Sequence, residues 1–137
     1  MGEDQLRKLN RQLSQLEDLD DATRRRSLHA LVGIFQDPLA LQALIQDPIA
    51  TDHLIKNLIN CFSDPVERCR DLSLSLIELF IRMCWTEHLS SIGQTIVFAS
   101  CSRFGNHPFP EPVEELRLRR FLRALVPLGP KLNLNRA

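Results

Sequence analysis

Apolar residues recur every three or four positions along most of the sequence, and this spacing is the strongest constraint on the fold. Between Glu3 and Asp18 the apolar positions are Leu6, Leu9, Leu13 and Leu16. Such spacing places the side chains on one face of an α-helix, whereas a β-strand would scatter them over both faces. Only five glycines occur in 137 residues, so the short glycine-punctuated strands of a sandwich or barrel are not indicated. The sequence predicts an all-α protein.

The same periodicity predicts six helices that pair along the chain. After the first, they are expected at about 20–36, 51–62, 65–85, 86–104 and 112–126. The motif Gln-Asp-Pro, followed by an apolar residue and Ala, occurs twice between the second and third, and each Asp-Pro can cap and open a helical turn. The expected architecture is an α-solenoid of about three helix pairs within 1–126, at about 3–36, 51–85 and 86–126, with a connector at 37–50 and a divergent or flexible tail at 127–137.

Three predicted helix starts share a pattern, in which an acid is followed six residues later by arginine. The pairs are Asp20 and Arg26, Asp64 and Arg70, and Glu111 and Arg117. The starts are 44 residues apart (64 minus 20) and then 47 residues apart (111 minus 64), within or at the edge of the roughly 40–47-residue period of HEAT and armadillo units. An acid at a helix start complements the helix dipole, and the arginine lies almost two turns further on.

The segment Asp64-Pro65…Cys69-Arg70 resembles the HEAT family, whose second helix typically opens with Asp-Pro and carries an apolar residue followed by Arg. This resemblance implies that the three acid and arginine pairs form a ladder between stacked repeats. Asp20, Arg26, Asp64, Arg70, Glu111 and Arg117 are then structural residues. The second helix of each pair would line the concave face.

Three longer segments resemble the N-terminal region of the HEAT-repeat dynein axonemal assembly factor family. They are Thr23–Leu31, Cys61–Arg70 and Glu111–Leu118. The resemblance implies a non-enzymatic scaffold for cytoplasmic preassembly of the axonemal dynein arms of motile cilia. Its implied partners are axonemal dynein chains, other assembly factors and chaperones. Pro127 breaks the last helix where the family continues through further repeats, so the chain is expected to be truncated or an alternative product.

Two other classes of function remain open on the sequence. One is a transport or trafficking adaptor of the karyopherin kind. The other is an enzyme, either a HEAT-like lyase or one that uses Cys69 as nucleophile, because this thiol lies in the first turns of a helix between Arg68 and Arg70. A buried structural Cys is the simpler interpretation. The sequence has no phosphate-binding loop, no nucleophile elbow and no His and Cys spacing typical of zinc ligands, so no cofactor or metal is expected.

Charge and hydropathy give no sign of nucleic-acid or membrane partners. Lys plus Arg equals Asp plus Glu, 17 against 17, so no global field attracts polyanions. The N-terminus lacks the apolar core of a signal peptide, and no run reaches roughly 18 apolar residues. We expect a cytoplasmic protein with reduced thiols.

Arginines cluster at 24–26 and along the last predicted helix. Each cluster is either a solvated face or a site that binds acidic protein surfaces. Nearby acids make the solvated face the simpler interpretation. Arg117, Arg120 and Arg123 share one broad face of the last helix. With Arg117 assigned to the ladder, Arg120 and Arg123 are the candidate partner-binding residues.

Overall fold

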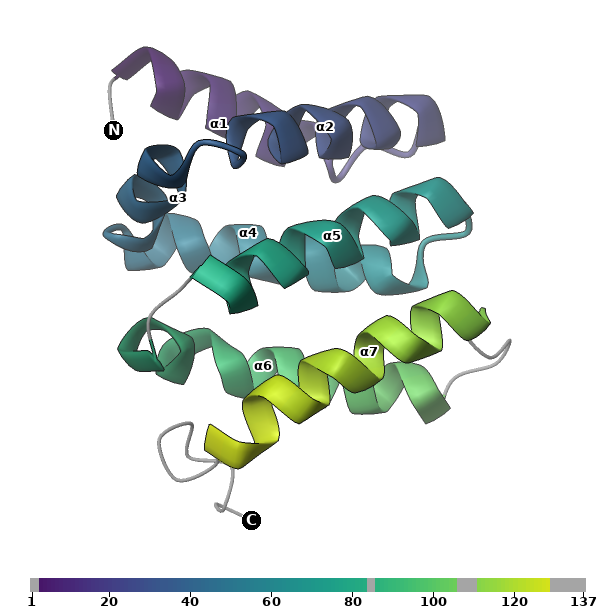
Figure 1. Cartoon of the computed structure of the whole chain (residues 1–137). Coiled ribbons are helices and arrows are strands. Elements are labelled where there is room, and N and C mark those ends of the chain that lie inside the picture. Colours follow the sequence, from purple (N-terminus) through teal and green to yellow (C-terminus); the bar gives the residue numbers. More distant parts are fainter. Residues whose placement is uncertain (1–2, 84–85, 106–110, 129–137) are drawn as a thin grey trace. The chain divides into compact units, whose positions relative to one another are not determined.

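The computed structural model describes residues 3–83, 86–105 and 111–128, which form α-helices and short 3-10 turns without a strand. The helices are α1 (Glu3–Gln15), α2 (Asp21–Ile34), α3 (Pro38–Ile45), α4 (Pro48–Asn60), α5 (Glu67–Met83), α6 (Thr86–Gly105) and α7 (Pro112–Leu125), with 3-10 turns η1 (Cys61–Ser63) and η2 (Val126–Leu128). The chain reverses direction between α1 and α2, between α4 and α5, and between α6 and α7 (Figure 1). The all-α, helix-pair class is therefore confirmed.

Two compact units divide the chain, Met1–Phe80 and Ile81–Ala137. The first holds α1 to α4 and most of α5, and the second holds the last residues of α5 together with α6 and α7. The expected tail at 127–137 lies outside the described residues from position 129 onward.

Asp-Pro pairs begin the helices of the connector region, as their sequence predicts. The Asp37 carboxylate accepts a hydrogen bond from the backbone N–H of Leu39, and that of Asp47 from Ala50. Pro38 and Pro48 occupy the first helical positions, where the missing N–H has no intrahelical partner to lose. The region 37–50 therefore consists of α3 and the first turn of α4, which begins three residues earlier than the expected Thr51.

Other helix boundaries also differ, by one to three residues, from those expected. The first helix ends at Gln15 instead of Asp18, and α5 begins at Glu67 instead of Pro65. The later start of α5 has a local cause, because the Asp64 carboxylate accepts the N–H of Val66 and holds these residues in a turn. Cys84 and Trp85, at the predicted end of the fourth helix, lie outside the described residues.

The core of the first unit is built from the predicted apolar stripes. Helix α1 packs on α2, and α1 also contacts α4. The fully buried side chains include Leu9, Leu13, Leu28, Leu31, Leu54 and Leu58. Ser27 is the polar residue of this α1–α2 contact, and its hydroxyl donates to the backbone carbonyl of Gln12 at 2.5 Å. A buried hydroxyl costs little when it is hydrogen-bonded in this way.

Helices α2 and α5 run side by side in the same direction, as the second helices of successive pairs in a repeat protein do (Figure 1). At their C-terminal ends the rings of Phe35 and Phe80 meet edge to face, with centroids 6.0 Å apart. At their N-terminal ends Arg24 contacts Asp64, just before α5. Contacts at both ends specify the register between the two helices.

The second unit is a helix hairpin in which α6 packs on α7. Its buried apolar residues include Ile92, Ile96 and Val97 from α6 and Leu118, Phe121 and Leu125 from α7. The starts of α2, α5 and α7 follow one another by 46 residues (67 minus 21) and 45 residues (112 minus 67). This spacing lies within the period of HEAT and armadillo units.

No single described helix is long and apolar enough to cross a membrane. Helices α2 and α3 reach that length and hydropathy only when taken together, and they bend by 103° at their junction. Their apolar residues include the buried Leu28, Leu31, Leu41 and Leu44. Burial of these residues in the first unit is sufficient to explain the apolar character of the pair.

Leucines on opposite faces of α3 provide a matched test of this packing. Leu41 is 1% exposed and Leu39 is 73% exposed. We expect Leu41→Ala to lower the free energy of unfolding by about 2–5 kcal/mol, because it leaves a cavity in the core, and Leu39→Ala to change it by less than about 0.5 kcal/mol. Urea denaturation measures both. Equal losses would contradict the observed orientation of α3.

Candidate protein-binding surface

A largely buried ion pair connects the first helix pair to the turn before α5. Arg24 donates from Nε to Asp64 Oδ2 at 2.8 Å and from Nη2 to Oδ1 at 3.2 Å, in a fork that matches the carboxylate. Its remaining terminal nitrogen, Nη1, donates to the backbone carbonyls of Asp18 and Leu19 at 3.0 and 2.9 Å. One guanidinium thus fastens the α1–α2 turn, α2 and the entrance of α5 together.

Asp64 and Arg70 form the second half of this arrangement. Arg70 Nη1 donates to the backbone carbonyls of Asp64 and Pro65, at 2.8 and 3.2 Å. Asp64 itself also accepts the Val66 N–H at 2.9 Å. Asp64 therefore combines a local role at the helix entrance with a contact 40 residues back along the chain.

Asp20 and Arg26, the expected ladder residues of the first pair, lie at the surface. Asp20 accepts a hydrogen bond from the Thr23 hydroxyl at 2.8 Å, and Arg26 Nη2 donates to the hydroxyl oxygen of Thr23 at 3.4 Å. The residue that contacts Asp64 is Arg24, which sequence reasoning placed only in the basic run. The sequence feature that indicates its inward orientation is its helical phase, since position 24 continues the buried stripe of positions 28, 31 and 35.

The second unit contains a buried ion pair that the sequence analysis also missed. Arg103 Nη2 lies 3.6 Å from Glu114 Oε2, and both side chains are buried. Both positions continue buried stripes, Arg103 after positions 92, 96 and 100 and Glu114 before positions 118, 121 and 125. Charges at inward positions of facing helices are a signal for such a pair. Glu111, the expected ladder acid, is exposed at the start of α7, and Arg117 is half-buried.

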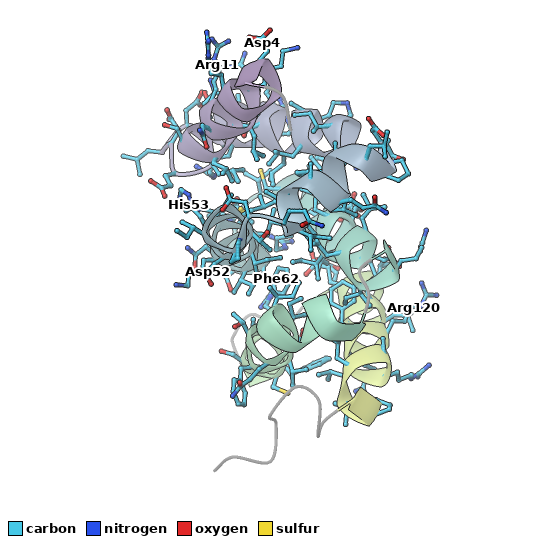
Figure 2. All side chains as sticks on the ribbon, turned by 90° about the vertical axis from the view of Figure 1, so that its left-hand side faces the viewer. Asp4, Arg11, Asp52, His53, Phe62 and Arg120 are labelled. Carbon is cyan, nitrogen blue, oxygen red and sulfur yellow. The ribbon has the colours of Figure 1, made fainter. Side chains whose placement is uncertain are left out.

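Burial, not distance, separates these pairs from the ion pairs at the surface. The side chains of Arg24 and Asp64 lie 2.8 Å apart and are 14% and 5% exposed. Those of Lys56 and Asp52 lie 2.9 Å apart and are 66% and 61% exposed. Asp52 lies on the outer side of α4 (Figure 2). Exposed pairs contribute about 0–1 kcal/mol, while removal of one partner from a buried pair costs roughly 3–5 kcal/mol.

Cys69 is fully buried, and both Asp64 and Arg24 act on it electrostatically. Burial raises the pKa of the Cys69 thiol, and the nearby Asp64 carboxylate raises it further. Burial also raises the pKa of Cys61, to about 12. A nucleophilic cysteine needs a lowered pKa and access to substrate, so Cys69 has the properties of a core residue.

No cluster of His, Cys, Asp and Glu in the described ranges has the arrangement of a metal site.

The outward face of α7, defined here as Val113, Leu116, Arg120 and Arg123, is exposed to solvent. Its positions follow one another by three, four and three residues, opposite the buried stripe of the same helix. Arg120 projects away from the helix (Figure 2). The neighbouring Arg119 is engaged, because it pairs with Glu115 at 2.9 Å and lies 5.4 Å from the ring centre of Phe104. Within the described part of the chain, Arg120 and Arg123 have no ion-pair partner.

Stacked helix pairs, ion pairs buried between their helices and a mixed apolar and cationic outer face define a helical-repeat protein. Residues 15–129 match the family described as dynein axonemal assembly factor 5-like, TPR repeats. The chain belongs to this family. It is 31% identical over 113 residues to dynein axonemal assembly factor 5 of Xenopus laevis, a match that covers 80% of this chain and 13% of that relative. No solved structure matches the chain.

The family description names TPR repeats, whereas the sequence analysis predicted HEAT units. Both consist of antiparallel helix pairs, but TPR units repeat every 34 residues and HEAT units every 40–47 or so. In this chain the starts of α2, α5 and α7 are 46 residues (67 minus 21) and 45 residues (112 minus 67) apart, which corresponds to the longer period.

Removing the Asp64 carboxylate should destabilise the first unit far more than removing a carboxylate at the surface. We expect Asp64→Ala to lower the free energy of unfolding by about 2–4 kcal/mol, because Arg24 is then left part-buried without its carboxylate. Asp52→Ala, which breaks a pair of the same length at the surface, should cost less than about 0.5 kcal/mol. Urea denaturation of both variants, and of Arg24→Ala with the double variant, measures the coupling. Additive losses from Arg24→Ala and Asp64→Ala would contradict the pair's role.

The cysteines should differ sharply in reactivity. At pH 8 a thiol of pKa about 12, as for Cys61, is ionised in roughly one molecule in ten thousand, and burial blocks access to it. We expect iodoacetamide to label the exposed Cys101 in the folded protein and to label Cys61 and Cys69 only after unfolding, as read by peptide mass spectrometry. Rapid labelling of Cys69 in the native protein would support the enzyme hypothesis.

Proposed function

We propose that the chain is a non-enzymatic, protein-binding scaffold for cytoplasmic preassembly of the axonemal dynein arms of motile cilia. Its partners would be axonemal dynein chains, other assembly factors and chaperones. The supporting observation is family membership across residues 15–129, a range that includes the outward face of α7. The chain corresponds to a small part of its relative's length, so it would contribute one binding surface to this function.

The geometry favours a role in binding over a role in catalysis. The charged side chains at inward positions, Arg24 and Asp64 in one unit and Arg103 and Glu114 in the other, are engaged with each other in the core. Cys69 is buried, and its pKa is raised. The exposed Arg120 and Arg123 remain available for contacts outside the chain. Family membership favours dynein assembly over the transport-adaptor alternative.

Arg120 and Arg123 are the residues proposed to contact acidic partner surfaces. Arginine suits this role because its planar guanidinium binds carboxylates through two hydrogen bonds and remains charged at any physiological pH. Both residues lie in the C-terminal half of α7, where positive charge also complements the helix dipole. The structural pairs leave these two arginines out, so a partner can bind them without disrupting the core.

Reversing the charge of Arg120 and Arg123 tests this proposal. We expect Arg120→Glu with Arg123→Glu to reduce recovery of axonemal dynein chains by about tenfold or more when the tagged protein is purified from multiciliated cells, because two charge-assisted contacts become repulsive. The melting temperature should change little, since exposed charges contribute about 0–1 kcal/mol to stability.

The matched control is Arg25→Glu with Arg26→Glu, which makes the same change of net charge at exposed positions of α2. Recovery should stay near that of the unmodified chain. Equal losses from both double variants would indicate a nonspecific effect of net charge, and undiminished recovery with the α7 variant would reject Arg120 and Arg123 as the site.

A further inference from the structure

The outward face of α7 combines two kinds of contact that are separated along the helix. Val113 and Leu116, 67% and 45% exposed, lie in its N-terminal half, and Arg120 and Arg123 lie in its C-terminal half. Exposed apolar side chains beside arginine are typical of the residues that dominate the binding energy of protein interfaces. Because one end of the face is apolar and the other is cationic, a partner that contacts both ends must bind in one direction along α7.

We propose that this face binds an amphipathic helix of a partner protein, with acids in the N-terminal half of that helix and apolar residues in its C-terminal half. The proposal rests on the proposed function, in which α7 contacts other proteins, and it specifies the chemistry and direction of the bound segment. The partner helix lies antiparallel to α7, so that its acids meet Arg120 and Arg123 and its apolar residues meet Val113 and Leu116.

Charges around the face support this direction. Glu111 is exposed at the start of α7, and Glu115 is engaged with Arg119 one turn further on. Partner carboxylates placed over Val113 would face the Glu111 charge, whereas carboxylates over Arg123 meet an arginine without a partner in the described structure. Acids in the first turns of a helix are also favoured by its own dipole. The antiparallel arrangement satisfies both requirements.

The spacing along α7 defines the partner further. The midpoint of Val113 and Leu116 lies seven residues before the midpoint of Arg120 and Arg123, which is about 10 Å at 1.5 Å per residue. A helical partner therefore needs its apolar pair about two turns after its acids. A second copy of this chain fits less well through Leu19, the most exposed large apolar residue of the described ranges, because acids flank Leu19 on both sides without this separation.

Two designed helical peptides of identical composition test the direction. One carries two Glu residues in its first turns and two Leu residues about two turns later, and the other carries the same residues in the opposite order. We expect the acid-first peptide to bind the full chain about tenfold more tightly by fluorescence anisotropy, since only this order allows both kinds of contact in the antiparallel orientation. Equal affinities would overturn the proposal.

Variants of the face separate the two kinds of contact. Val113→Ser with Leu116→Ser should lower the affinity for the acid-first peptide by about tenfold and leave the salt dependence of that affinity unchanged. Arg120→Gln with Arg123→Gln should also lower this affinity, and the affinity should then depend less on salt concentration. Leu19→Ser, which removes an exposed apolar residue elsewhere, is the matched control and should have no effect.

The outcomes also separate this proposal from the proposed function. If charge reversal at Arg120 and Arg123 abolishes recovery of dynein chains while the Val113 and Leu116 variant and the peptide order have no effect, the scaffold function stands and the amphipathic partner is rejected. If sedimentation instead detects concentration-dependent self-association that the α7 variants remove, the occupant is a second copy, which also overturns the proposal.

Discussion

The fork between Arg24 and Asp64 is the interaction on which the first unit depends. A helix pair cannot bury its apolar face alone, so a repeat protein needs contacts that specify how one pair meets the next. Here a part-buried guanidinium binds two backbone carbonyls of the α1–α2 turn and one carboxylate at once. Together with the Phe35–Phe80 contact at the opposite ends of α2 and α5, it specifies the register between these two helices, which hydrophobic stripes alone do not determine.

Charged residues have two separate roles in this chain, and their helical phase decides which one each takes. Arg24, Arg103 and Glu114 occupy inward positions, where the low dielectric makes an unpaired charge costly and a partner necessary. Arg120 and Arg123 occupy outward positions, where solvent screens them and no internal partner is required. The inward charges therefore stabilise the fold, and the outward ones are available for recognition.

The proposed function places recognition on an exposed surface of the chain and gives the buried thiols a structural role. The environment that makes Cys69 suitable for the core, full burial beside a carboxylate, also raises its pKa and makes it a poor nucleophile. The outward face of α7 has the opposite properties, being exposed, cationic and partly apolar. The range that matches the dynein axonemal assembly factor 5-like family, residues 15–129, includes that face.

The sequence by itself determined the class of fold, the approximate helices and the family, because helical periodicity, Asp-Pro caps and repeat spacing are local properties of the chain. It also placed Asp64 at a helix start and a row of arginines on one face of the last helix. Only the tertiary structure decided that Arg24 is the partner of Asp64, that Arg103 and Glu114 pair in the core, and that Arg119 is engaged while Arg120 and Arg123 are not. The physical reason is that a long side chain selects its partner by distance and burial, and both depend on how separate helices pack. A periodic pattern places a residue on a face of its own helix, but it does not specify which residue of another helix lies opposite.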